Sequence, residues 1–319
     1  MKKYEINPDK SPLINIDTSF HNYVSKRTRE KDIHMKGSVP DYAFSLDNEL
    51  RARLDKIPGF FSLCKKITAT QTSRMMQIYN QQGLLVGPNQ YPEIYQMGMD
   101  CAHRLGIGVP NIYIVSSSEM NAFTYSIDDV SPMIVLYTGI IDRMTPRELK
   151  CVIGHECGHI HNLHSIYKHA IDILLNGGKG SIGVILSYAD IALMRMWTRA
   201  QEITADRAAL ICSDSLKDAW STNYKLMSGG TINTSYDTEA DLQALRQQLE
   251  VTLNNPTKLL ELMNNHPSSI RRIFAEMEFA ECQTYYSWRP EAKKPDSICR
   301  SKEQTDARVQ KLVNIWNNR

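Results

Sequence analysis

The chain has 319 residues, enough for one large catalytic domain or two smaller domains, and its 37 basic and 35 acidic residues leave a formal net charge of +2. This balance gives no support for nucleic acid as a partner or for strongly acidic substrates. Seven cysteines are scattered without CxxC spacing. They argue against a disulfide framework and a cysteine zinc site, so a reducing compartment, the cytoplasm, is expected.

Residues 1–39 are predicted to form a basic-leaning N-terminal extension. The first 20 residues carry charged side chains and have no apolar core of signal-peptide length, so secretion is not expected. The basic residues between Lys26 and Lys36 are diluted by Glu30 and Asp32, which favours a solvated arm. Contact of this arm with acidic lipid or with a partner stays open.

A catalytic domain is predicted over residues 40–289. Residues 47–67 have a helical pattern that Pro58-Gly59 interrupts, and Pro92 opens a helix that is apolar on one face through Leu105. Three short β-rich runs follow Pro110, at residues 112–115, 122–126 and 133–137. These runs predict a small sheet directly ahead of the next helix.

The next helix begins with a capping sequence and carries a metal-binding motif. Thr145 can cap it, Pro146 suits its first position, and Glu148 completes a capping box. The motif is His155-Glu156-Cys157-Gly158-His159. At about 100° per residue the two histidines share one face and can hold one metal, while the glutamate lies beside them. This HExxH pattern is typical of zinc hydrolases.

A catalytic zinc needs a third protein ligand and an open position for water. A metzincin would have Gly and His at positions 162 and 165, but the chain has Asn162 and Ser165. A downstream carboxylate is therefore favoured, and Glu202 is the best candidate. Asp206 follows one turn later and can reach the same site, where it would support a ligand histidine.

Two further histidines and one cysteine lie close to the motif. His161 and His164 do not share the face of the paired histidines on a continuous helix, so neither is predicted to be a ligand. Cys157 points away from the metal and is predicted to pack in the core.

The remaining chain is predicted to be mostly helical. Apolar residues recur at helical spacing from residue 182 to 197, which predicts a buried helix running into the Glu202 segment. Asp190 and Arg195 interrupt this run, so its uninterrupted apolar part is too short to span a bilayer. Further helices are expected at residues 241–253, 258–263 and 268–279. Residues 290–319 are expected to be a linker and a C-terminal helix that packs on the domain.

These motifs make the chain resemble the HtpX-like and CAAX-prenyl-protease-like family of zinc metallopeptidases. The resemblance spans residues 121–273 and is carried, in the family's order, by Asn121-Ala122-Phe123, HECGH, the Arg199–Arg207 segment, and His266-Pro267 with Arg272-Ile273. It implies that Glu202 is the third ligand, that Asp206 orients a histidine, and that Asn121 and His266 lie beside the substrate. It also implies that the run of Asn121, Ala122 and Phe123 is a sheet edge that binds the substrate as an added strand. Membrane-bound relatives carry transmembrane helices between the two metal segments, and this chain departs from them there.

The expected fold is α+β: a mainly helical zincin-type metallopeptidase domain with a small β-sheet before the active-site helix. The expected function is a zinc-dependent metalloendopeptidase with one Zn²⁺ per chain, in which zinc and Glu156 activate water and His266 stabilises the oxyanion. Its expected partner is a polypeptide, by resemblance an unfolded or damaged segment. No nucleic acid and no transmembrane segment are expected, and peripheral membrane contact stays open. The alternative is a non-catalytic, zinc-stabilised protein-binding module, in which Glu156 would be dispensable.

Overall fold

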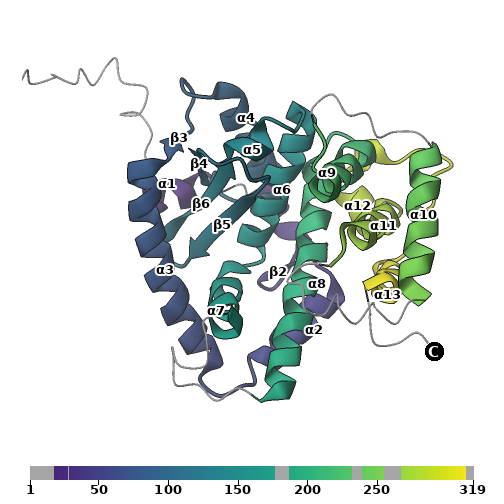
Figure 1. Ribbon diagram of the computed structural model, residues 1–319, viewed down its shortest axis with the longest axis horizontal. Coiled ribbons are helices and arrows are strands. Elements are labelled where there is room, and N and C mark those ends of the chain that lie inside the picture. The colour runs from purple at the N-terminus through teal and green to yellow at the C-terminus, as the bar shows by residue number, and fades with distance from the viewer. Residues whose placement is uncertain (1–17, 28, 177–186, 232–238, 255–266, 314–319) are drawn as a thin grey trace, which may run out of the picture.

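The computed structural model describes residues 18–27, 29–176, 187–231, 239–254 and 267–313 (Figure 1). The helices in these ranges are α1 (Phe20–Ser25), η2 (Arg29–His34), α2 (Ser45–Leu54), α3 (Phe60–Gln82), α4 (Pro92–Leu105), α5 (Thr138–Ile141), α6 (Pro146–His161), α7 (Ser165–Asn176), α8 (Tyr188–Cys212), α9 (Leu216–Ser228), α10 (Glu239–Asn254), α11 (Ser269–Ala280), α12 (Gln283–Trp288), η4 (Pro290–Ala292) and α13 (Lys302–Val313). The strands are β1 (Met35–Lys36), β2 (Val39–Pro40), β3 (Leu84–Leu85), β4 (Asn111–Val115), β5 (Ala122–Ile127) and β6 (Val130–Tyr137). The predicted α+β class, mainly helical with a small sheet ahead of the active-site helix, is confirmed.

The larger sheet has the strand order β3-β4-β6-β5, so β5 is one of its edges. Strands β4 and β6 run parallel, whereas β3 and β5 pair antiparallel with their neighbours. The turn between β5 and β6 contains Asp129 at a φ of 64°, a left-handed conformation that Asp tolerates better than most residues. The three predicted β-rich runs are β4, β5 and β6. Strand β3 is too short to show a periodic pattern in the sequence.

Helices cover both faces of this sheet. Helix α3 packs on one face, where Tyr79 joins a cluster with Met133 and Val135. Helices α4 and α6 pack on the other face, against Ile134 and Leu136. Strand β6 is therefore buried on both sides, which is why its sequence is apolar without alternation. In Figure 1 the sheet lies between α3 on one side and α6 and α8 on the other.

The predicted helices are present where the chain is described, with three differences. Helix α3 starts after Gly59, whose φ is 73°, and continues to Gln82, far beyond the predicted end at residue 67. Helix α7 has no counterpart in the sequence prediction. Helix α8 is capped by Ser187 and Asp190 in a capping box, so the aspartate that interrupts the apolar run marks the helix start. The predicted helix at residues 258–263 lies outside the described residues.

Helices α6 and α8 pack closely because two glycines of α6 face small residues of α8. A Cβ atom added to Gly158 would lie 2.6 Å from Ala208 Cβ, and one added to Gly154 would lie 2.7 Å from Cys212 Cβ. Larger side chains at these positions would push the two helices apart. This close approach brings the HECGH motif to Glu202.

Helices α9 to α13 gather on the other side of α8 from the sheet (Figure 1). Helix α11 packs against α8, α9 and α13, and α13 also contacts α2. Asp306 of α13 accepts a hydrogen bond at 2.6 Å from Nη2 of Arg207, the residue that follows Asp206 in the chain. The domain boundaries predicted after residues 39 and 289 stay predictions.

Candidate metal centre

The helix that carries the motif begins as its sequence predicts. Thr145 Oγ1 accepts a hydrogen bond from the N–H of Glu148, and Glu148 Oε2 accepts one from the N–H of Thr145 at 2.8 Å. The same carboxylate accepts a hydrogen bond from Lys225 Nζ of α9 at 2.7 Å, and both side chains are buried. The capping box therefore also anchors α6 to α9.

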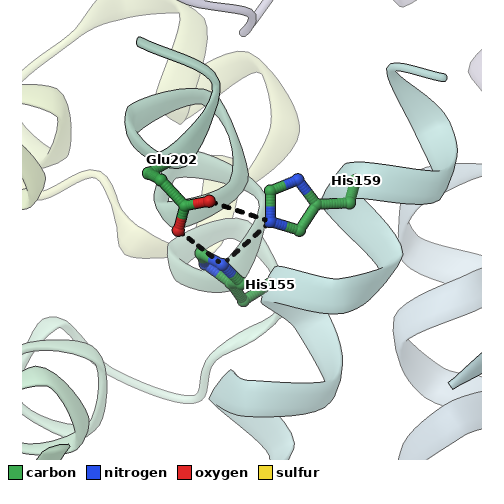
Figure 2. A group of neighbouring side chains, drawn as sticks. All are labelled: His155, His159 and Glu202. Atoms are coloured by element: carbon green, nitrogen blue, oxygen red, sulfur yellow. Dashed lines mark hydrogen bonds and ion pairs between the residues drawn. The ribbon is translucent and has the colours of Figure 1, made fainter. Parts of the chain in front are cut away.

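Three side chains converge from α6 and α8 with their donor atoms turned toward one another (Figure 2). His155 Nε2 lies 3.1 Å from His159 Nε2 and 3.5 Å from Glu202 Oε2, and His159 Nε2 lies 3.6 Å from Glu202 Oε1. Ligand atoms about 2.0–2.1 Å from a tetrahedral zinc would stand about 3.3–3.4 Å from one another. The two imidazoles and the carboxylate therefore fit a zinc ion in both spacing and chemistry.

His155 is oriented by the carboxylate predicted to support a ligand. Its Nδ1 lies 3.0 Å from Asp206 Oδ1, and Arg272 of α11 holds the same carboxylate by Nε to Oδ2 at 2.8 Å and Nη2 to Oδ1 at 2.6 Å. Burial lowers the pKa of His155, but the hydrogen bonds that its ring donates to the Asp206 and Glu202 carboxylates outweigh it and raise that pKa to about 9. The carboxylates thus make this imidazole a strong base, which suits a metal ligand. The Asp206 pKa stays below its usual value because Arg272 outweighs the effect of burial.

His159 has a separate support that the sequence analysis did not identify. His164 Nδ1 lies 2.8 Å from His159 Nδ1, and His164 Nε2 lies 3.0 Å from Asp47 Oδ2 of α2. Thr204 Oγ1 donates to that same Asp47 oxygen at 2.7 Å. An ionised carboxylate only accepts, so His164 donates from Nε2 to Asp47, and its Nδ1 can then accept a hydrogen bond from Nδ1 of His159. His159 then presents the lone pair of Nε2 to the metal site.

The chain turns sharply to place His164 beside His159. Helix α6 ends at His161, and Leu163 adopts a φ of 58° in the left-handed region that non-glycine residues rarely enter. The prediction that His161 and His164 do not share the ligand face agrees with their positions: His161 Nδ1 lies 3.1 Å from Tyr42 Oη, away from the centre. Cys157 is buried, as predicted for a packing residue.

A cavity of about 300 Å³ opens at the centre, and His155 and Glu202 are among the residues that line it. Glu156 and Lys168 line it, and Lys168 Nζ of α7 donates to Glu202 Oε1 at 3.2 Å. Burial, followed by the nearby Lys168 ammonium, holds the pKa of His159 well below its usual value, so that imidazole is neutral. Lys168 belongs to the helix that the sequence did not predict, so its place at the centre was not foreseen.

The residues predicted to meet the substrate divide into three groups. Asn121 and Ala122 line the cavity. Phe123 does not line it: its ring lies in an aromatic cluster on the opposite face of the sheet, 5.5 Å from the ring of Tyr137. His266 lies outside the described residues, while the following residue, Pro267, lines the cavity.

Among the described helices, none has both the length and the apolar character needed to cross a bilayer.

Two histidines one turn apart on a helix, a glutamate from a second helix and a carboxylate beside them are the site of an HExxH metallopeptidase. The family model described as Peptidase family M48 matches residues 88–277. The chain belongs to peptidase family M48, and the metallopeptidase class predicted from its motifs is confirmed.

Relatives by sequence bear metallopeptidase names. The plastoglobule-localized metallopeptidase 48 of Arabidopsis thaliana, a chloroplastic protein, is 29% identical over 192 residues, which are 59% of this chain and 56% of that protein. A protease HtpX homolog of Ralstonia nicotianae is 25% identical over 241 residues, which are 66% of this chain and 81% of that protein. The crystal structure of S. mikatae Ste24p aligns with 78% of this chain and 66% of its own, at 17% identity and a TM-score of 0.39.

Proposed function

We propose that this chain is a zinc-dependent endopeptidase that hydrolyses peptide bonds, with His155, His159 and Glu202 as the zinc ligands. The observation that carries the proposal is the convergence of three donor atoms beside a cavity that Glu156 also lines. Zinc in such a site supplies Lewis-acid polarisation of a carbonyl and makes water acidic enough to attack near neutral pH. His155 and His159 are each held by a hydrogen-bonded partner, so the ligand set is pre-oriented.

Glu156 is the proposed general base and acid. It is buried, borders the cavity and directly follows a ligand in the chain, so its carboxylate can take the proton of the attacking water and deliver it to the leaving amine. His266 is proposed to stabilise the oxyanion, on the basis of its place in the family's His-Pro motif and of Pro267 at the cavity.

The proposed substrate is an extended polypeptide segment, such as an unfolded or damaged stretch of protein. Strand β5 is a sheet edge, and its first residue, Ala122, lines the cavity together with Asn121. A substrate strand added to this edge would have its backbone held beside the donor atoms. The cytoplasm is proposed as the compartment, because all seven cysteines are free thiols.

A non-catalytic zinc-stabilised module would close the metal with a fourth protein ligand. Within the described ranges, the group of metal-binding side chains consists of His155, His159 and Glu202. This composition favours an enzyme, whose metal keeps a position open for reaction.

Glu156→Gln tests the function. The variant keeps the shape of the side chain and all three ligands, so zinc content and thermal unfolding should match the parent protein, while cleavage of an unfolded protein substrate should fall by about 10²- to 10⁴-fold. Glu119→Gln, a change at an exposed glutamate, is the matched control and should cleave normally. Near-normal cleavage by the Glu156→Gln protein, with trace protease excluded, would contradict the role of Glu156 as general base, whereas absence of cleavage by both the parent and the variant would favour the non-catalytic module.

A further inference from the structure

The backbone N–H and C=O groups of the edge strand β5 point toward β6 at one residue and away from it at the next. Tyr137 N–H donates to the carbonyl of Asn121 at 3.1 Å, and Ala122 and Thr124 lie opposite Leu136 and Ile134. Hydrogen-bonded and non-hydrogen-bonded pairs alternate along an antiparallel ladder. The N–H and C=O groups of Ala122 and Thr124 therefore point away from β6, toward the outer edge of the sheet, where an added strand would pair.

The outer edge is already occupied at Thr124. His169 of α7 donates from Nε2 to the carbonyl of Thr124 at 3.0 Å, and its ring stacks on Tyr125 with centroids 4.3 Å apart and planes 17° from parallel. Burial, with Lys168 close by, lowers the pKa of His169 to about 4. The ring is therefore neutral near pH 7 and keeps one N–H for this carbonyl.

No such contact covers the preceding pairing position. In the part of the chain that the structure describes, no side chain donates to Ala122 or accepts from it, and Ala122 borders the cavity. An antiparallel peptide residue opposite Ala122 can therefore form two backbone hydrogen bonds. The next pairing residue of the peptide would need the Thr124 carbonyl that His169 holds.

We propose that His169 ends the substrate-binding edge, so that a bound peptide pairs with Ala122 but not with the carbonyl of Thr124. This inference rests on the proposed function, because it assigns the length of the substrate that the same cavity accepts. His169 is a specificity-determining residue in this view: it limits the backbone contacts on one side of the scissile bond. Lys168 and His169 are neighbours on α7, so this helix reaches the metal site and closes the edge beside it.

The experiment measures binding of a peptide ladder to zinc-loaded protein in which Glu156→Gln prevents cleavage. Peptides with a common cleavage sequence are lengthened one residue at a time, in separate series at each end. With His169 present, Kd should stop improving once the peptide has paired with Ala122. In the His169→Ala protein, peptides that extend past Ala122 should bind with a Kd about 2- to 12-fold lower, the range expected for one added hydrogen bond. This gain should be seen in only one of the two series.

Two further variants separate the role of the hydrogen bond from a general effect on folding. His169→Gln places an amide donor close to the position of Nε2 and should restore the length limit of the parent. His103→Ala removes an exposed histidine of α4 and should leave both series unchanged. Equal length dependence in the His169→Ala and parent proteins, or absence of peptide binding by both, would overturn the proposal. If peptides bind with the expected length limit but the parent protein, which retains Glu156, does not cleave them, the result would contradict the proposed function and leave this inference standing.

Discussion

His164 Nδ1 lies 2.8 Å from Nδ1 of His159, the second histidine of the HECGH motif. His164 follows His159 by five positions in the chain, and the left-handed turn at Leu163 folds one back onto the other. Asp47 of α2 completes a line of hydrogen bonds that runs from its carboxylate through His164 and His159 to the metal site. Such outer partners fix the ring orientation of a ligand and raise its basicity.

We expect His164→Ala to weaken zinc binding by about 10- to 100-fold. The measurement is the zinc Kd from competition with a chelator. His164→Asn keeps an acceptor near the position of Nδ1 and should recover part of the affinity. His161→Ala removes the last residue of α6, a histidine whose Nδ1 lies beside Tyr42 Oη, so it should leave the zinc Kd unchanged; a loss equal to that of His164→Ala would refute the assigned role.

Asp206 supports the first ligand in a similar way, and its removal should also be visible in the zinc Kd. Asp206→Asn keeps one acceptor oxygen for His155 but removes the charge that pairs with Arg272. We expect zinc affinity or turnover to fall by about 10- to 100-fold. Asp190→Asn, a change at an exposed helix cap with no link to the centre, is the control. Unchanged affinity and turnover in the Asp206 variant would remove this residue from the site.

Gly158→Ala should disturb the metal centre without touching a ligand. The added methyl would lie 2.6 Å from Ala208 Cβ and 3.0 Å from Ala205 Cα, so α6 and α8 must move apart. Overpacking of this kind costs about 1–3 kcal/mol, and separation of the helices also displaces Glu202 from the two histidines. Thermal unfolding and zinc Kd measure the two effects. The double variant Gly158→Ala with Ala208→Gly removes the closest contact and should recover part of the lost stability and part of the lost zinc affinity. If the effects of the two substitutions simply add, the contact between positions 158 and 208 is not the cause.

Glu148 predicts an acid dependence of folding stability. Burial alone would raise its pKa, but Lys225 and the N–H of Thr145 outweigh that effect and hold the pKa below its ordinary 4.5. A carboxylate whose folded pKa is depressed stabilises the fold above its unfolded pKa, and this contribution is lost as pH falls through the folded pKa. Glu148→Gln should therefore reduce the free energy of unfolding most at pH 7, and the deficit should shrink below about pH 4.5.

The loss at pH 7 should reach about 3–5 kcal/mol, because Lys225 would remain buried without its partner. Urea unfolding at several pH values gives the measurement. Glutamine can still complete the capping box, so the loss reports the ion pair rather than the cap. The double variant Glu148→Gln with Lys225→Met removes the unpaired ammonium and should be more stable than Glu148→Gln alone. A deficit that stays constant from pH 7 to pH 3 would contradict the assignment.

The sequence by itself was sufficient for the features that depend on near neighbours. A capping box acts within four residues, and the helical period places His155 and His159 on one face whatever surrounds the helix. The same period places Asp206 one turn after Glu202 on α8. These local rules, with the β-rich runs before Thr145, predicted the α+β class and the candidate ligand set.

Tertiary structure alone decided which distant residues complete the site. Asp47 reaches His164 across 117 positions, and His169 reaches Thr124 across 45, because α2 and α7 pack against elements that the sequence order does not place beside them. Phe123 packs away from the cavity because successive residues of a strand face opposite sides of the sheet, and the packing of α3 and α6 determines which side is which. Local periodicity determines which residues lie on the same face of a helix or strand. It does not determine what that face contacts, because the contact depends on how the helices and the sheet pack in the folded chain.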